Sequence, residues 1–110
     1  MPKETTQTIS DWAEKTFGVA GSNARVAARA NEEMAELLRK VTSVTDRSAE
    51  DLIAQECADV VIVLHRLARR CGYDLYEAVD AKMEINRQRE WKQDGSGHGY
   101  HVRERKENNG

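Results

Sequence analysis

Apolar residues recur at helical spacing along most of this chain of 110 residues, and glycines separate the stretches that carry them. After Ser22 they form one side of a helix, at Val26, Ala30, Leu37 and Val41. We expect this helix to begin near Ser22 and to run through Val41. No segment shows the alternating apolar and polar positions of a half-buried strand, so the pattern predicts helices only.

Capping signals indicate helices on both sides of that stretch. Ser10 is a candidate N-cap for a first helix, which Gly18 and Gly21 end. Ser48, followed by acidic residues in the first turn, opens a third helix, and Gly72 closes it.

A fourth helix follows directly. Asp74-Leu75-Tyr76-Glu77 is a capping-box pattern, and we expect the helix that it starts to end around Trp91 or Lys92. Residues 95–101 are too rich in glycine to be helical.

Short connections between long helices are typical of an antiparallel bundle. We therefore predict an all-α fold of about four helices, with a single domain over residues 1–102 and a flexible polar tail over residues 103–110. The third helix is apolar on nearly all sides, since Val61 and Ile62 lie away from its main apolar arc. In a chain this small a second subunit is the expected cover, which predicts a homodimer or homotetramer, unless the first and fourth helices wrap the third.

Charge and composition exclude several classes of protein. The formal charge is −2 and no long basic block occurs, which argues against nucleic-acid binding. No apolar run approaches the ~18 residues of a membrane span, and residues 1–5 lack a signal-peptide core, so we expect no membrane partner and a cytoplasmic location. Cys57 and Cys71 would lie about 21 Å apart on one helix, too far for a disulfide, and we expect both to be buried and reduced.

The most informative polar residues are four carboxylates in two pairs at i,i+3 spacing, Glu33 with Glu36 and Glu56 with Asp59. Residues three apart on a helix are surface neighbours, so each pair projects its oxygens toward one point. Glu56 and Asp59 also fall inside or against the apolar side of their helix. Because an unpaired buried charge loses several kcal/mol of hydration, a positive partner is required there.

Clustered carboxylates with few basic neighbours favour a hard divalent cation. Ligation by oxygen alone favours Mg²⁺, with Mn²⁺ as a substitute, over Zn²⁺. The alternative interpretation is that these acids are solvated helix faces. It applies more readily to Glu33 and Glu36 than to Glu56 and Asp59, because only the second pair lies within an apolar side.

The fourth helix carries a second polar group, formed by Lys82, Asn86 and Arg89 at i, i+4 and i+7. These positions share one helix face within about 60°. Two cations and an amide on one face suit phosphate oxygens, because Arg can bind them with two hydrogen bonds and Lys acts as a point charge. The alternative is a solvated basic face that pairs with neighbouring glutamates.

Taken together, these motifs resemble the MazG-like all-α nucleoside triphosphate pyrophosphohydrolases. The resemblance covers roughly residues 22–92 and rests on Glu32-Glu33-Met34-Ala35-Glu36, on Glu56-Cys57-Ala58-Asp59, and on Lys82, Asn86 and Arg89 before Trp91. Either acidic motif alone would be weak, whereas their order and spacing, followed by the basic face, are more specific.

The resemblance implies a reaction and a set of roles. The metal ligands would be Glu33, Glu36, Glu56 and Asp59, and the substrate a nucleoside triphosphate, hydrolysed between the α and β phosphates to a monophosphate and pyrophosphate. Glu36 is the favoured general base, and Glu32 is an outer alternative.

Substrate recognition follows from the same resemblance. Lys82 and Arg89 would hold the β and γ phosphates, while Asn86 orients a phosphate or a ligand carboxylate. Trp12 and Phe17 are candidates for stacking on the base, against a role in packing alone.

The base and the remaining histidines are less well specified. A purine deoxynucleotide, dATP or dGTP, is the preferred substrate in this interpretation. His65 lies off the metal face and is expected at an interface or a cap. His98, Tyr100 and His101 either fold over the nucleotide or are disordered.

Three other classes of protein are alternatives to this interpretation. A di-iron carboxylate bundle needs Glu-x-x-His pairs, and no His follows these glutamates by three residues. A non-catalytic helical module that binds metal or nucleotide would explain the helices but not the acids in the apolar side. A phosphohydrolase that releases orthophosphate would use the same metal chemistry, so only the products distinguish it.

Overall fold

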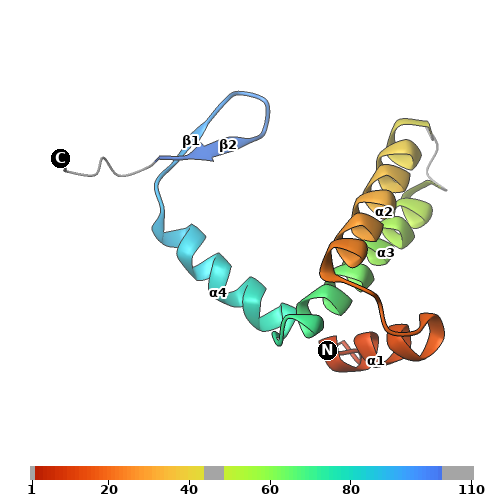
Figure 1. Cartoon of the computed structure of the whole chain (residues 1–110). Helices are drawn as coiled ribbons and strands as arrows, with labels where there is room; N and C mark the ends of the chain where they lie inside the picture. Colours follow the sequence, from red (N-terminus) through yellow and green to blue (C-terminus); the bar gives the residue numbers. More distant parts are fainter. Residues whose placement is uncertain (1, 44–48, 103–110) are drawn as a thin grey trace. The chain divides into compact units, whose positions relative to one another are not determined.

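The computed structural model describes residues 2–43 and 49–102 (Figure 1). Within these ranges the elements are α1 (Thr6–Phe17), α2 (Asn23–Ser43), α3 (Ala49–Arg70), α4 (Leu75–Gln88), β1 (Trp91–Gln93) and β2 (Gly99–His101). The chain divides into two compact units between Glu77 and Ala78. Four helices dominate, as the sequence predicts. The predicted cap Ser48 and the predicted tail 103–110 lie outside the described residues.

The first unit is built on the pairing of α2 with α3. These two helices run side by side in opposite directions, as the orange-to-yellow and green segments show, and α1 packs against α3 (Figure 1). Ser22 Oγ accepts the N–H of Arg25 at 3.1 Å, which confirms the predicted start of α2. Gly72 follows the end of α3 with a φ of 83°, a conformation that glycine adopts without a steric cost.

Two threonines form the cap of α1, which starts before the predicted cap. The side chain of Thr5 accepts the N–H of Thr8, and the Thr8 hydroxyl oxygen accepts the N–H of Thr5 at 2.8 Å, which completes a capping box. Ser10 is therefore a buried residue inside the helix, and its predicted role as N-cap is wrong. The predicted end is confirmed, because Gly18 is the C-cap.

The second unit contains a hairpin that the prediction of helices alone missed. Strands β1 and β2 pair antiparallel, with Trp91 opposite His101. Asp94 Oδ1 accepts the N–H of Ser96 at 2.9 Å, and Gly95 has a φ of 86°. An Asp-Gly step of this kind is a hairpin signal, and it outweighs the helical pattern before it.

Because the hairpin begins at Trp91, α4 ends earlier than predicted. The helix starts as predicted, since Asp74 Oδ1 accepts the N–H of Glu77 at 3.1 Å. It ends at Gln88 rather than around Trp91 or Lys92. The Trp91 indole N–H donates to the Asn86 carbonyl at 2.8 Å, which satisfies one of the last carbonyls of the helix.

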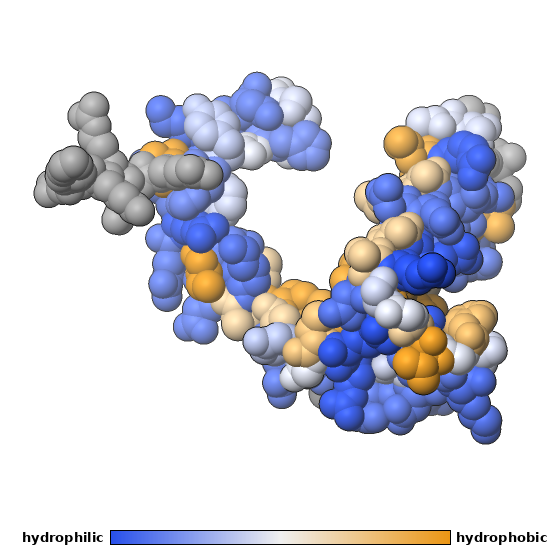
Figure 2. All heavy atoms as spheres, viewed as in Figure 1, coloured by the Kyte–Doolittle hydropathy of each residue, from blue (hydrophilic) through white to orange (hydrophobic). Residues whose placement is uncertain are grey.

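Much of the apolar surface of the chain is exposed. Among the described residues, the buried hydrophobic side chains are Ala13 and Val26. Figure 2 shows orange hydrophobic residues at the surface among blue hydrophilic ones. On α2 and α3 the exposed large residues are Met34, Leu38, Val41, Leu52 and Val61.

The two cysteines follow the same trend. Cys57 and Cys71 are free thiols, but both are exposed, so the prediction that they are buried is wrong. Cysteine is among the most often buried residue types, whereas the helices of this chain leave most of their side chains partly uncovered.

A buried histidine anchors α1. His65 on α3 is 1% exposed, and its Nδ1 lies 2.8 Å from Thr6 Oγ1. The Thr6 hydroxyl also accepts the N–H of Leu75 at 2.9 Å. The imidazole packs on the Tyr76 ring with the centroids 4.8 Å apart. His65 thus joins the starts of α1 and α4 to α3, and the role that it fills is a structural one.

An ion-pair cluster fixes the other end of α1. Arg66 Nη2 lies 3.1 Å from Glu14 Oε2 and donates to the Gly18 carbonyl at 2.6 Å. Arg70 lies 3.8 Å from the other oxygen of Glu14 and donates to Asn23 Oδ1 at 2.8 Å. These contacts tie the end of α1 and the start of α2 to α3.

The stability of the fold should depend on the protonation of His65. Burial lowers the pKa of His65 below its ordinary 6.5, although Asp74 acts in the opposite direction. The neutral imidazole therefore contributes stability that is fully present above pH 6.5 and is lost as the pH falls through the lower folded-state pKa. We expect the thermal midpoint of unfolding to decrease as the pH is lowered from 7.5 to 5. The contribution of His65 to this decrease should be absent in His65→Gln.

His98→Gln is the matched control, because His98 is exposed. Its thermal midpoint, measured by circular dichroism, should depend on pH as that of the wild type does. Identical pH profiles for wild type and His65→Gln would contradict the role given to His65.

Candidate metal centre and adjoining cleft

The pairing of α2 with α3 brings three carboxylates together. Glu33 on α2 and Glu56 and Asp59 on α3 each offer an oxygen, and these oxygens lie within 4.8 Å of one another. Glu56 and Asp59 share a face of α3 because they are three residues apart, and Glu33 approaches from the facing helix. Three of the four predicted metal ligands therefore meet at one point.

The donor set suits a hard divalent cation. Three carboxylate oxygens supply negative charge and no nitrogen or sulfur, which is the ligand chemistry that Mg²⁺ and Mn²⁺ prefer. Three like charges this close repel one another unless a positive group lies between them. Glu33 and Glu56 are half-buried, while Asp59 is exposed, so a cation could enter from the side of Asp59.

The two candidate bases lie on α2 beside this cluster. Glu36 is outside the group of three, and its carboxylate pairs with Arg39 one turn further along the helix. Glu32 is largely exposed and accepts a hydrogen bond from Arg29 at 3.0 Å.

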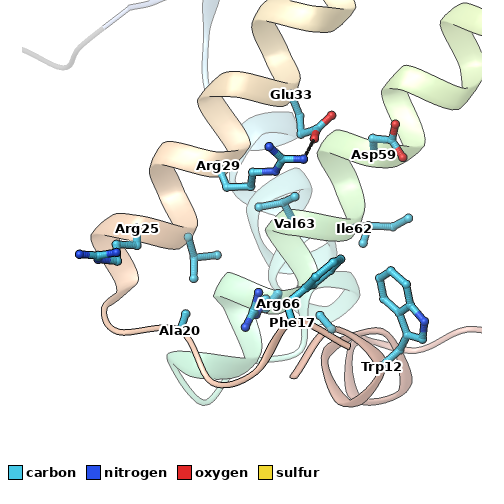
Figure 3. A pocket seen from close by; sticks show the side chains of 12 residues that line it. Trp12, Phe17, Ala20, Arg25, Arg29, Glu33, Asp59, Ile62, Val63 and Arg66 are labelled. Atoms are coloured by element: carbon cyan, nitrogen blue, oxygen red, sulfur yellow. Dashed lines mark ion pairs between the residues drawn. The ribbon is translucent and has the colours of Figure 1, made fainter. Parts of the chain in front are cut away.

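A cleft of about 620 Å³ extends from the cluster to α1. Its polar end carries Glu33, Asp59 and Arg29, and its other end carries Trp12 and Phe17 (Figure 3). The remaining lining comes from Ala13, Ala20, Arg25, Val26, Ile62, Val63 and Arg66. The cleft is thus acidic at one end and apolar and aromatic at the other.

The aromatic end is preorganised by one ring contact. The rings of Trp12 and Phe17 meet edge to face with their centroids 5.4 Å apart. They are 52% and 66% exposed, so both retain ring surface for a ligand. The predicted stacking candidates therefore line the same cleft as two of the predicted metal ligands.

The predicted phosphate-binding residues belong to the second unit. Lys82 and Asn86 lie on α4, and Arg89 comes just after the end of that helix. Lys82 is exposed, and Asn86 and Arg89 are half-buried. The side-chain oxygen of Asn86 is buried and has no hydrogen-bond partner within the described part of the chain.

Sequence reasoning missed three charged residues beside the cleft. Arg29 pairs with Glu33 at 2.7 Å, and its i,i+4 spacing to Glu33 was a signal that could have revealed the pair. Arg66 and Glu14 come from different helices, so no local spacing announces their contact.

Comparisons with known proteins give a family match and a structural match. The model of the MazG-like family matches residues 27–100. The chain is also similar to a solved structure from cyanophage S-2L, a MazG-like pyrophosphohydrolase bound to dGDP and three catalytic Mn²⁺ ions per active site. The TM-score is 0.66 and the identity 30%, over 89% of this chain and 93% of that chain. No curated protein matches this chain.

These two matches place the chain in the class of hydrolases that act on nucleotide phosphoanhydride bonds. The family match covers most of the chain, and the structural match covers 89% of it. The chain belongs to the MazG-like family.

Removal of one carboxylate from the cluster should abolish stabilisation by a divalent cation. At about 100 times its Kd, a cation that binds only the folded chain adds about 2.7 kcal/mol. We expect Mn²⁺ to raise the thermal midpoint of the wild type and to have little effect on Glu56→Gln. Without Mn²⁺, Glu56→Gln should be at least as stable as the wild type, because repulsion among the carboxylates is reduced.

Asp51→Asn is the matched control, since Asp51 is an exposed acid on the same helix. Its shift with Mn²⁺ should equal that of the wild type. An undiminished shift in Glu56→Gln would show that the cation binds elsewhere.

Proposed function

We propose that this chain is a divalent-cation-dependent nucleoside triphosphate pyrophosphohydrolase. It would cleave the bond between the α and β phosphates and release a nucleoside monophosphate and pyrophosphate. The observation that carries the proposal is the group of three carboxylates within 4.8 Å at the end of an aromatic cleft. The cyanophage relative, which holds dGDP and Mn²⁺, supports it.

Four carboxylates are the proposed metal ligands. Glu33, Glu56 and Asp59 are in place, and Glu36 would join them by turning from Arg39 toward the cluster. Mg²⁺ is the proposed cation, with Mn²⁺ as a substitute. When bound, a divalent cation supplies charge neutralisation for the phosphates and acidifies a water molecule.

The side chains around the cluster would handle the proton of the attacking water. Glu36, or Glu32 as the outer alternative, accepts this proton while the water attacks the α phosphorus in line with the departing pyrophosphate. Both carboxylates lie on α2, within one turn of Glu33. Arginines hold both of them, Arg39 for Glu36 and Arg29 for Glu32, so either must exchange a salt bridge to act as a base.

The proposed substrate is a purine deoxynucleotide, dATP or dGTP. Its base would stack on Trp12 and Phe17, whose rings offer apolar surface at the far end of the cleft. The dGDP in the cyanophage relative supports a purine. Lys82 and Arg89 would hold the β and γ phosphates, and Asn86 would orient a phosphate or a ligand carboxylate.

The proposed assembly is a homodimer or homotetramer. Met34, Leu38 and Val41 recur at i, i+4 and i+7 on α2, and all three are exposed in the single chain. An apolar helix side of this kind is typical of a surface that a partner covers.

No described helix is long and apolar enough to cross a membrane, and a cytoplasmic location stays a prediction.

A single functional domain over residues 1–102 is also part of the proposal. The family match runs across the boundary between the two compact units, from residue 27 to residue 100. Within this proposal, the hairpin of β1 and β2 belongs to the same domain as the helices.

The reaction is tested with a panel of common dNTPs and NTPs in water enriched in ¹⁸O. We expect hydrolysis only with Mg²⁺ or Mn²⁺, fastest for dATP or dGTP, with monophosphate and pyrophosphate as products. Because the water oxygen bonds to the phosphorus that it attacks, ¹⁸O should appear in the monophosphate and not in the pyrophosphate. Mass spectrometry of the separated products measures both.

Two variants make the assay specific. Asp59→Asn should lose activity by at least about 100-fold, in line with the loss of a metal ligand, and Asp51→Asn should retain it. Orthophosphate and a diphosphate would overturn the proposed bond. Turnover of no nucleotide would favour a non-catalytic binding module.

A further inference from the structure

Arg29 bridges the two glutamates at the start of the acidic motif. Its Nη1 lies 3.0 Å from Glu32 Oε2, and its Nη2 lies 2.7 Å from Glu33 Oε1. The Glu33 side chain is only 15% exposed, whereas Arg29 is 62% exposed. Figure 3 shows this ion pair beside Asp59. A solvent-exposed arginine thus holds an oxygen of a proposed metal ligand.

The other arginines of the cleft are placed differently. Arg66 is committed to Glu14 and to the Gly18 carbonyl at the far end. Arg25 lines the cleft without an ion pair among the described residues. Of the cleft cations, Arg29 is the one whose guanidinium contacts the carboxylate cluster within the described chain.

The charge of Arg29 has opposite effects on the two ligands of the site. A positive charge a few ångströms from Glu33 repels a divalent cation and competes with it for the carboxylate oxygen. The same charge attracts a polyphosphate, and the planar guanidinium can bind two phosphate oxygens at once. A phosphate bound near Glu33 could therefore replace Glu33 as the partner of Arg29.

We propose that Arg29 is a phosphate-binding residue that exchanges Glu33 for a phosphate oxygen of the nucleotide. The inference rests on the proposed function and adds a residue that the acidic and basic motifs do not include. The exchange frees the Glu33 oxygen for the cation as the nucleotide binds. Cation and nucleotide then strengthen each other's binding, and by thermodynamic linkage the effect is the same in both directions.

The test measures binding in the absence of turnover, by calorimetry with Mn²⁺ alone and then with inorganic pyrophosphate or dGDP in the presence of Mg²⁺. Arg29→Gln removes the charge and keeps a side chain of polar character. We expect it to bind Mn²⁺ alone about threefold to fivefold more tightly, as loss of a nearby exposed charge implies. It should bind each phosphate probe about tenfold more weakly, as loss of a charged hydrogen bond implies.

Two variants separate this role from general charge. Arg25→Gln removes the same charge one turn earlier, and it should leave Mn²⁺ affinity within about twofold of the wild type, because exposed charges are screened with distance. Arg29→Lys keeps the charge but not the planar fork, so its Mn²⁺ affinity should match the wild type while its affinity for pyrophosphate falls. Circular dichroism checks that each variant folds.

Three results would overturn the proposal. If Arg29→Gln binds Mn²⁺ less tightly, or equally, Arg29 orients Glu33 rather than competing for it. If its affinity for both probes is unchanged, or if the wild type binds Mn²⁺ but neither probe, Arg29 does not bind phosphate. If the wild type binds no Mn²⁺ and hydrolyses no nucleotide, the proposed function fails as well, which distinguishes the two failures.

Discussion

The structure of the site depends on the packing of α2 against α3, which holds three carboxylates within 4.8 Å of one another. Such an arrangement is unfavourable by itself, because like charges at this distance repel. The packing of α2 on α3 and the ion pair of Arg29 with Glu33 must oppose this repulsion when no cation is bound. The acidic cluster is therefore a place where local stability is lowered, and a bound cation is expected to stabilise the fold.

The cleft is shaped by a different set of contacts, which position α1. Thr6 is bound to the buried His65 at one end of α1, and Glu14 is bound to Arg66 at the other. Trp12 lies between these two anchors and lines the cleft. The aromatic end of the cleft thus depends on buried polar contacts of α3, while the acidic end depends on the pairing of α3 with α2. One helix, α3, supports both ends.

Local signals in the sequence predict much of this arrangement. The start of α2 near Ser22 and the capping residue Asp74 of α4 are predicted locally, and the shared face of Glu56 and Asp59 follows from their spacing of three residues. Two contacts that escaped prediction join distant parts of the chain, Thr6 with His65 and Glu14 with Arg66, whereas the missed pair of Arg29 with Glu33 is local. The hairpin after α4 is a separate case, because its Asp-Gly turn is a local signal that an analysis of helical periodicity alone does not detect.

The central claim is that Glu33, Glu56 and Asp59 hold the catalytic cation. The most direct measurement is the anomalous diffraction of crystals grown with Mn²⁺ and dGDP, recorded at the manganese absorption edge. We predict anomalous peaks about 2.1 Å from an oxygen of each of these carboxylates, close to the distance typical of Mg²⁺ ligation. Manganese found only at other sites, with the three carboxylates bound to protein groups alone, would contradict the account.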